Sequence, residues 1–388
     1  MKILVRGPLL SQSGYGVHSR QVFSYLLCQK NVEIVTQILP WGITPWCVNT
    51  EKEKGIYGEI MSRSRPINEK FDMSFQVQLP NEWDPNLAKF NVGVTAGVET
   101  DKCSKDWATV HREKMDLIIV PSSHTKMTFV NSGTGKEKTP IHVVQEYYFD
   151  ELLEEVDTSQ FSFSTSKNFM TIGMFTAEDP KSDRKNVENL IKWFCQEFDG
   201  VDDVGLIVKA SKGRETTIDR EIVRKTLRGV VSASGAKKHP KIYMLHGSMT
   251  RKEMASLYKH ESILGFCSAT RGEGFGLPML EAAVAGLPVI CTNWSSVTEF
   301  LDGKSFLAVD YDLTAIPKER VDNSIFISGT RWANPREQSF KKNLRKLYNN
   351  YEEIKSIANK KADSLSIAYG KDSTTQAYDK ILGNIIRK

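Results

Sequence analysis

Short apolar runs alternate along the chain with glycine-rich turns and amphipathic segments. "KILV" (2–5) predicts a buried strand, and "SQSGYG" (11–16) predicts a turn. "VHSRQVFSYLLCQK" (17–30) has the apolar stripe of a helix, and "VEIVTQIL" (32–39) predicts the next strand. A strand, a glycine turn, a helix and a strand in this order are typical of the opening of a parallel α/β sheet.

The same pattern runs through the first half of the chain and then restarts. Further apolar runs lie at 73–79, 90–96, 115–122 and 141–149, and then at 169–175, 204–211, 241–247, 262–269 and 288–293. The polar, serine-rich stretch 157–168 predicts a linker between the two series. We therefore predict two doubly wound α/β domains, residues 1–160 and 166–371, followed by an amphipathic helix at about 372–388. With ligands beyond the carboxyl ends of strands, a cleft between the domains is the expected active site.

Charge is distributed unevenly over the 388 residues. Residues 1–165 hold 17 Lys and Arg against 20 Asp and Glu, which gives a net charge of −3. Since the whole chain has a net charge of +5, the remaining residues have a net charge of +8. A site for a phosphate-rich ligand is therefore expected in the second half. Six cysteines without close pairs favour buried thiols in a reducing compartment. Without an apolar run of membrane-spanning length or a signal-peptide pattern, we expect a cytoplasmic protein with no transmembrane segment.

The stretch "RGEGFGLPMLEAAVAGLPVI" (271–290) places Glu273 in a glycine-rich loop and Glu281 one turn inside the following helix. Gly274 and Gly276 allow backbone amides to approach a ligand closely, at a helix N-terminus that favours phosphate. Carboxylates that touched a phosphate would repel it, whereas they accept hydrogen bonds from sugar hydroxyls on either side of it. The stretch therefore predicts a nucleotide-sugar site, with ribose at one glutamate and hexose at the other.

A longer string, "LYKHESILGFCSATRGEGFGLPMLEAAVAGLPVICTN" (257–293), resembles the E-x(7)-E signature of retaining nucleotide-sugar glycosyltransferases (the family-four type, group 1). The resemblance implies the GT-B fold, with two Rossmann-like domains facing each other across a cleft. It also implies that the C-terminal helix crosses back to the first domain. In this family the loop and the start of the helix bind the donor. The matching residues are Glu273 at the donor sugar, Glu281 at the ribose, and the loop residues Gly274, Phe275, Gly276 and Leu277.

Basic residues of the second half fit the same resemblance. "SDRKN" (182–186) lies where the family has a basic pair on the donor diphosphate, which assigns that role to Arg184 and Lys185. The Gly-Arg that usually follows the preceding strand is replaced here by Gly173 and Met174. Lys209, at the end of a predicted strand, is the second candidate for the missing positive charge. These cations would stabilise the leaving phosphate electrostatically, so we expect neither a cofactor nor a metal.

The first half carries the other expected contacts. "SGYG" (13–16) matches the position of the family's first glycine loop, so Gly14 and Gly16 are expected to close over the donor. Glu99 lies where many members have an acceptor-side histidine, and we expect it to contact the acceptor. Four histidines have no spacing typical of metal sites and are interpreted as surface or structural residues: His18, His111, His124 and His246.

The expected function is retaining transfer of a sugar from a nucleoside-diphosphate donor, with a UDP-sugar as the first expectation, to an acceptor hydroxyl in glycan biosynthesis. The acceptor would be a glycan or a lipid-linked sugar. A viral-type transferase acting on hydroxymethylated DNA bases is an alternative, which the acidic first half disfavours. A non-catalytic nucleotide-sugar binding protein is an alternative of another class. An epimerase of the same fold would lack the paired glutamates. The sequence leaves the oligomeric state open.

Overall fold

The computed structural model describes residues 1–177 and 179–386, and its contacts divide the chain into two compact units. Unit 1 comprises Met1–Tyr147, Asp322–Thr330 and Tyr369–Lys388, and unit 2 comprises Tyr148–Val321 and Arg331–Ala368. The expected boundary near residue 160 is therefore wrong by about a dozen residues, because the chain from Tyr148 onwards packs with the second unit. Sequence alone did not indicate that 322–330 joins the first unit.

Unit 1 is built on a six-stranded parallel sheet in the order β2-β1-β3-β4-β5-β6. The strands are β1 (Lys2–Gly7), β2 (Glu33–Ile38), β3 (Phe71–Val77), β4 (Ala88–Val94), β5 (Leu117–Val120) and β6 (Ile141–Val143). The helices are α1 (Gly14–Leu27), α2 (Ile56–Ser62), α3 (Ser123–Ser132) and α10 (Lys371–Ile386). Strand order reverses between β1 and β3, a switch point at which doubly wound sheets bind ligands.

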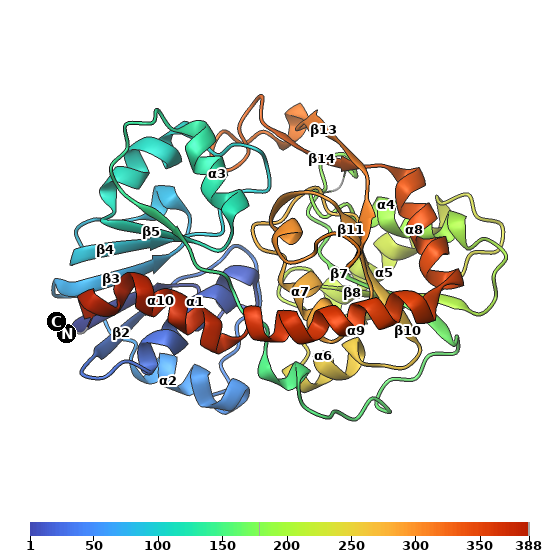
Figure 1. The fold of residues 1–388 in the computed structure, drawn as a ribbon, viewed down its shortest axis with the longest axis horizontal. Coiled ribbons are helices and arrows are strands. Elements are labelled where there is room, and N and C mark those ends of the chain that lie inside the picture. Colours follow the sequence, from blue (N-terminus) through green and yellow to red (C-terminus); the bar gives the residue numbers. More distant parts are fainter. Residues whose placement is uncertain (178, 387–388) are drawn as a thin grey trace. The chain divides into compact units, whose positions relative to one another are not determined.

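The C-terminal helix α10 lies beside α1 within unit 1 (Figure 1). Its apolar face buries Tyr378, Leu382 and Ile386 in the same core as the strands β1, β3 and β4. The rings of Tyr25 and Tyr378 stack with their centroids 4.7 Å apart. The last stretch of the chain therefore completes the core of the first unit.

Unit 2 repeats the design with a different strand order, β12-β11-β10-β7-β8-β9, again all parallel. The strands are β7 (Lys167–Gly173), β8 (Val204–Ala210), β9 (Lys241–His246), β10 (Ile263–Ser268), β11 (Val289–Thr292) and β12 (Leu307–Val309). The helices are α4 (Val187–Glu197), α5 (Thr217–Ser232), α6 (Arg251–Tyr258), α7 (Leu277–Val284), α8 (Glu337–Asn349) and α9 (Tyr351–Ala368). Here the order reverses between β7 and β10, so their carboxyl ends form the second switch point.

Two features of unit 2 were not predicted from the sequence. An antiparallel hairpin joins β13 (Tyr311–Ala315) to β14 (Arg331–Pro335), whose strands are separated in sequence by the segment that packs with unit 1. The helix α9 packs against α7, and the Lys355 ammonium donates to the Gly286 carbonyl at 2.6 Å. This bond helps to hold the C-terminal end of α7 in place.

Candidate functional site

The loop after β10 and the start of α7 form the framework of the site in unit 2. Gly276 is the residue before the helix, in the left-handed conformation with φ +98°. A Cβ at this position would lie 2.7 Å from a methyl carbon of Val297, so both the conformation and the space require glycine. The hydroxyl of Ser296 lies 2.8 and 2.7 Å from the carbonyl oxygens of Glu273 and Phe275, shares its one proton between them, and thereby fixes the loop. α7 begins at Leu277, directly after Gly276.

Lys185 and Glu273 meet at the switch point of unit 2. The Lys185 ammonium lies 2.7 and 2.6 Å from the two carboxylate oxygens of Glu273. The connection after β7 supplies the lysine and the connection after β10 supplies the glutamate, so adjacent strands bring together residues that are 88 positions apart. The Glu273 side chain is 9% exposed, so removing either partner would leave a charge that is costly to keep buried alone.

Asp183, a residue that was not singled out from the sequence, holds the backbone at Thr176 and from Lys185 to Val187 in shape. Its buried carboxylate accepts hydrogen bonds from the backbone amides of Thr176, Lys185 and Val187 at 3.2, 3.2 and 2.9 Å. These bonds satisfy donors at the start of α4, as a helix cap does. Asp183 therefore fixes the backbone on either side of Lys185.

Arg271 clamps the same connection from the other side. It is 4% exposed, and its guanidinium donates to the carbonyls of Asp183 and Pro180 at 3.1 and 3.3 Å. The same group lies over the ring of Trp332, 5.4 Å from the centroid. Arg271 thus ties together the loops that carry Lys185 and Glu273. The sequence places Arg271 two residues before Glu273. No local pattern, however, distinguishes an arginine that bonds buried backbone carbonyls from one that binds a phosphate.

Glu281 lies one turn inside α7, as predicted, and its carboxylate accepts a hydrogen bond from the Tyr258 hydroxyl at 3.0 Å. Burial raises the pKa of Glu281 to about 7, although the Tyr258 hydrogen bond and the charge of Arg251 act in the opposite direction. Burial and the neighbouring Glu281 raise the pKa of Tyr258 well above its usual value, so the phenol stays a donor. The carboxylate keeps further acceptor capacity for hydroxyls.

Arg184 and Lys209 occupy different places at this edge of the sheet. Arg184 is half-buried, its amide donates to the Thr176 hydroxyl at 3.1 Å, and its carbonyl accepts the amide of Arg271 at 2.9 Å. Lys209 lies at the end of β8, 8% exposed, and donates to the Gly247 carbonyl at 2.7 Å. Burial lowers the pKa of Lys209. The structure thus joins Lys185 to Glu273, while Lys209 is bonded to the loop after β9.

The glycine loop of unit 1 precedes α1, and the Ser13 hydroxyl caps this helix by accepting the Gly16 amide at 3.1 Å. A Cβ on Gly16 would lie 2.0 Å from the Ser11 carbonyl oxygen, whereas the space at Gly14 is open. Gly16 is therefore required by the turn itself. Glu99 is half-buried in the connection that follows β4. It lies close enough to Tyr15 of this loop to contribute to a raised phenol pKa, whose main cause is burial.

Comparisons with known proteins give one family match and several matches to solved structures. Residues 232–319, which include the loop and α7, match the model of the glycosyl transferases group 1 family. No curated protein matches the chain by sequence. Among solved structures, the sucrose-phosphate synthase of Thermosynechococcus elongatus aligns with a TM-score of 0.66 at 12% identity, over 100% of this chain and 99% of its own. The chain has the GT-B fold.

Two further structures with this fold were determined with ligands. Anabaena HepE in complex with UDP and glucose aligns with a TM-score of 0.63 at 14% identity, over 99% of this chain and 100% of its own. S. aureus TarM, a mutant in complex with Fondaparinux, alpha-GlcNAc-glycerol and UDP, aligns with a TM-score of 0.53 at 12% identity. That match covers 81% of this chain but only 55% of TarM, so the chain spans about half the length of that relative.

The histidines are spread through the GT-B fold. Burial lowers the pKa of His18 and of His124 to about 4, and also lowers those of His111 and His246. Within residues 1–177 and 179–386, no three His, Cys, Asp or Glu side chains cluster in a way that could hold a metal ion. Over the same residues, no helix combines the length and apolar character needed to span a bilayer.

Proposed function

We propose that the protein is a retaining glycosyltransferase that moves a sugar from a nucleoside-diphosphate donor, with a UDP-sugar as the expected donor, to an acceptor hydroxyl in glycan biosynthesis. The observation that supports this best is the contact of Lys185 with Glu273 at the switch point of unit 2, with Glu281 one helical turn further on. At one helix N-terminus, the protein offers a cation that can bind phosphate and two carboxylates that can accept hydrogen bonds from hydroxyls. These are the groups that recognition of a nucleotide-sugar needs.

Each member of the ion pair would exchange its partner when the donor binds. The Lys185 ammonium would turn to a diphosphate oxygen, and the Glu273 carboxylate would accept hydrogen bonds from the hydroxyls of the transferred sugar. Neither charge would then be left buried alone. A ligand with only a diphosphate or only a sugar would compensate only one of the two charges. The site therefore favours the intact nucleotide-sugar over free nucleoside diphosphate or free sugar.

Transfer requires the bond between the anomeric carbon and the diphosphate oxygen to break while negative charge accumulates on the leaving group. Lys185, Arg184 and the amides of the loop before α7 would stabilise that charge, and Lys209 is a further candidate at the end of β8. The acceptor oxygen would attack from the face that the diphosphate leaves, and its proton would pass to a diphosphate oxygen. The configuration at the anomeric carbon is then retained.

On the ribose side, the Glu281 carboxylate would accept hydrogen bonds from the 2′- and 3′-hydroxyls. Tyr258 holds the carboxylate by a hydrogen bond to one oxygen, so the orientation of the acceptor groups is set before the nucleotide arrives. Such pre-organisation reduces the entropy that binding loses. We further propose that no divalent ion takes part, because cationic side chains and the start of α7 can neutralise the diphosphate.

The test is a panel of nucleotide-sugars assayed by thermal shift, followed by turnover with and without acceptor. A donor at a hundred times its dissociation constant should stabilise the protein by about 2.7 kcal/mol. Release of nucleoside diphosphate that depends on an acceptor, with an anomeric proton coupling in the product that matches the donor, would support the proposal. Binding without any turnover would favour the non-catalytic alternative, and a requirement for a divalent ion after chelator treatment would contradict the metal-free mechanism.

A further inference from the structure

Two tryptophans of the connection after β2 lie against the glycine loop of unit 1. Trp46 forms an isolated antiparallel bridge with Ser11, and the amide of Cys47 donates to the Leu10 carbonyl at 2.9 Å. The ring of Trp41 stacks on that of Tyr15, with centroids 4.1 Å apart and an angle of 26° between the planes. Trp46 remains 45% exposed. Aromatic faces are therefore presented at the start of α1.

This aromatic cluster lies at the switch point of the first sheet. The Tyr15 hydroxyl is 2.8 Å from the Thr95 hydroxyl and accepts the Ala96 amide at 3.2 Å, just beyond the end of β4. Gln78, the first residue after β3, is fully buried and its amide donates to the Val94 carbonyl at 3.1 Å. In doubly wound sheets this edge, between the strands where the order reverses, is where a ligand binds.

The Gln78 side chain offers an unused hydrogen-bond acceptor there. Its carboxamide nitrogen donates to the Glu82 carbonyl, while its carbonyl oxygen has no hydrogen-bond partner among the described residues. A buried amide oxygen without a donor is unfavourable by roughly 1–3 kcal/mol. A ligand hydroxyl would remove that cost.

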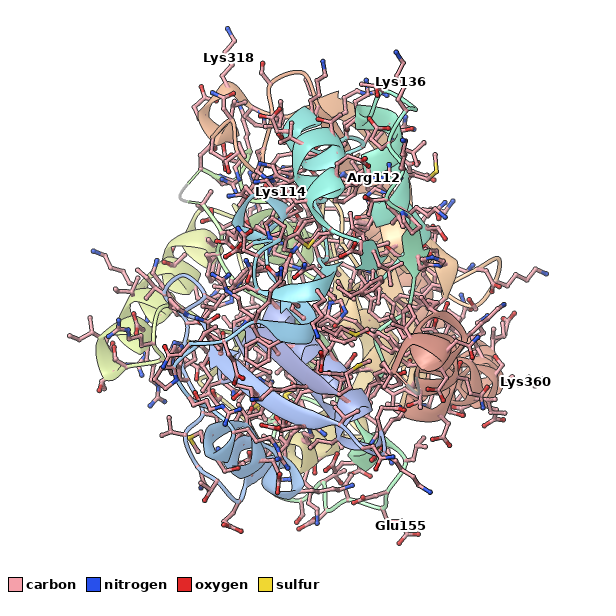
Figure 2. The ribbon with its side chains drawn as sticks, turned by 90° about the vertical axis from the view of Figure 1, so that its left-hand side faces the viewer. Arg112, Lys114, Lys136, Glu155, Lys318 and Lys360 are labelled. Carbon is pink, nitrogen blue, oxygen red and sulfur yellow. The ribbon has the colours of Figure 1, made fainter. Side chains whose placement is uncertain are left out.

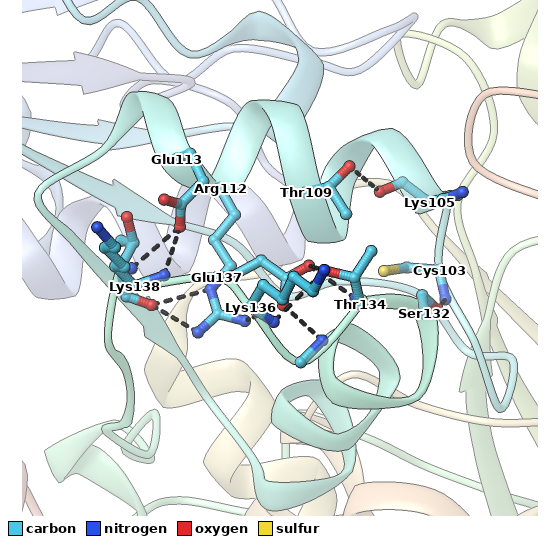
Figure 3. A network of polar contacts seen from close by, with 12 residues as sticks. Cys103, Lys105, Thr109, Arg112, Glu113, Ser132, Thr134, Lys136, Glu137 and Lys138 are labelled. Carbon is cyan, nitrogen blue, oxygen red and sulfur yellow. Dashed lines mark hydrogen bonds and ion pairs between the residues drawn. The ribbon is translucent and has the colours of Figure 1, made fainter.

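Positive charge is scarce at this edge, because the Arg20 guanidinium beside the glycine loop is buried, donates to the Ser11 carbonyl at 2.9 Å and pairs with Glu53. The connections from the strands of unit 1 to the elements that follow them contain only two basic residues, Lys102 and Lys105. Neither is at the switch point, because the amide of the intervening Cys103 donates to Ser132, in the last turn of α3, at 3.0 Å (Figure 3). Negative charge is close instead, since Glu99 and Glu82 both contribute to the raised pKa of Tyr15.

Three basic residues near β5 and β6 lie at the opposite edge of the sheet, away from the switch point. Arg112 and Lys114 directly precede β5, and Lys136 precedes β6, so all three lie toward the amino ends of parallel strands (Figure 2). The Arg112 guanidinium donates to the Thr139 carbonyl at 2.8 Å, and Glu113 accepts the amide of Lys138 at 2.9 Å (Figure 3). These contacts fix the basic loop away from the switch point.

From this juxtaposition we infer that Tyr15, Trp41, Trp46 and Gln78 form the acceptor site, and that the acceptor is a neutral saccharide. The inference rests on the proposed transfer reaction and specifies its second substrate. Aromatic rings pack against the C–H face of a pyranose, while the Gln78 oxygen accepts one of its hydroxyls. Duplex DNA or an anionic lipid headgroup would need lysines or arginines for its phosphates, and this edge offers acids instead.

The test measures saccharide binding without any donor. Saturation-transfer NMR with neutral maltose, cellobiose and lactose is compared with sulfated forms of the same disaccharides, hydroxymethylated duplex DNA and phosphatidylglycerol vesicles. At least one neutral saccharide should bind through its C–H face, and Trp46→Ala should weaken that binding about tenfold. Ile43→Ala is the matched control, because Ile43 is 71% exposed in the same connection, and it should bind as the wild type does.

Failure of this inference can be told apart from failure of the proposed reaction. UDP affinity, measured by calorimetry on the same variants, should be unchanged by Trp46→Ala, because UDP is assigned to unit 2. Preferred binding of the sulfated sugars, the DNA or the vesicles would overturn the neutral-saccharide inference, as would unaltered saccharide binding in Trp46→Ala. A wild type that binds neutral saccharide but no nucleotide-sugar would instead refute the proposed transferase.

Discussion

Each of the two parallel sheets has a switch point, and the two switch points differ in strand order and in chemistry. In unit 2 the connections after β7, β8 and β10 carry six basic residues, namely Lys181, Arg184, Lys185, Lys212, Arg214 and Arg271. In unit 1 the corresponding edge presents Tyr15, Trp41 and the Gln78 amide, with acids nearby. A parallel sheet therefore determines where a ligand can bind, and the residues of the connections determine which ligand it is.

Loss of the central cation of unit 2 should have the largest effect. Lys185→Ala should lower kcat by roughly 10²–10³-fold, because the loss of one pre-organised hydrogen-bond donor to a developing negative charge typically lowers kcat by about that factor. The Michaelis constant of the donor should change less, since the charge grows toward the transition state. Lys181→Ala, which removes an exposed lysine from the same connection, is the matched control and should retain activity. Steady-state kinetics at saturating acceptor would measure both.

A change in the Michaelis constant alone would show that Lys185 only anchors the donor. Lys185→Ala also leaves the Glu273 carboxylate buried without its partner, so a loss of stability could be mistaken for a loss of catalysis. Lys185→Ala combined with Glu273→Gln removes both charges. It should recover the melting temperature without recovering turnover.

In unit 1, the two glycines of the first loop should respond differently to the same substitution. Gly16→Ala places a Cβ 2.0 Å from the Ser11 carbonyl oxygen and should disrupt the loop that meets Trp46, whereas Gly14→Ala enters open space. We expect Gly16→Ala to reduce transfer by about 10²-fold or more, as small misplacements at an active site do, while UDP affinity is unchanged. Full activity in Gly16→Ala would return the loop to the status of an ordinary turn.

Ribose recognition by unit 2 should give the next largest effect. Glu281→Ala removes an acceptor of hydrogen bonds, and a bond to a charged group is worth about 1.5–3 kcal/mol, so UDP affinity should fall roughly 10- to 100-fold. Calorimetric titration with UDP measures this directly. Glu261→Ala, at an exposed glutamate of the same unit, serves as the control. Equal affinity in the Glu281→Ala protein and the wild type would refute the ribose assignment.

The smallest effect concerns pH. The raised pKa of Glu281, about 7, means that the side chain is largely protonated at pH 6 and largely ionised at pH 8. Ribose hydroxyls donate to the ionised form, so UDP affinity should be highest above pH 7 and fall several-fold as the pH is lowered through it. Glu281→Gln should lose this dependence, and subtracting its titration removes the contribution of the UDP phosphate itself.

Stability should change with pH in the opposite direction. Because folding raises the pKa of Glu281 from 4.5 to about 7, the unfolded chain releases its proton first. The contribution of this group to stability is therefore greatest below pH 4.5 and is lost as the pH rises to about 7. Glu281→Gln should flatten this decline in thermal unfolding experiments. A difference between the wild-type and Glu281→Gln curves that rises with pH over the same interval would contradict the raised pKa.

Local pattern was sufficient for the elements that position the candidate site. The alternation of apolar runs and turns predicted both parallel sheets, and the glycine-rich stretch 271–290 predicted a loop followed by the helix that begins at Leu277. The spacing of Glu273 and Glu281 predicted a loop residue and a helix residue eight positions apart. These features depend on neighbours within a few positions, where steric preference and periodicity are set by the sequence itself.

Tertiary structure alone decided which side chains meet. Lys185 contacts Glu273 across 88 positions, and Arg271 holds the connection of Lys185, because β7 and β10 are neighbours in the second sheet. Tyr258 reaches Glu281 from another helix, and Trp41 reaches Tyr15 from another loop. The sequence determined that the molecule has two parallel sheets, with a glycine-rich loop before a helix in the second. The order of the strands, which follows from the packing of whole helices and sheets, determined the partners of each charge.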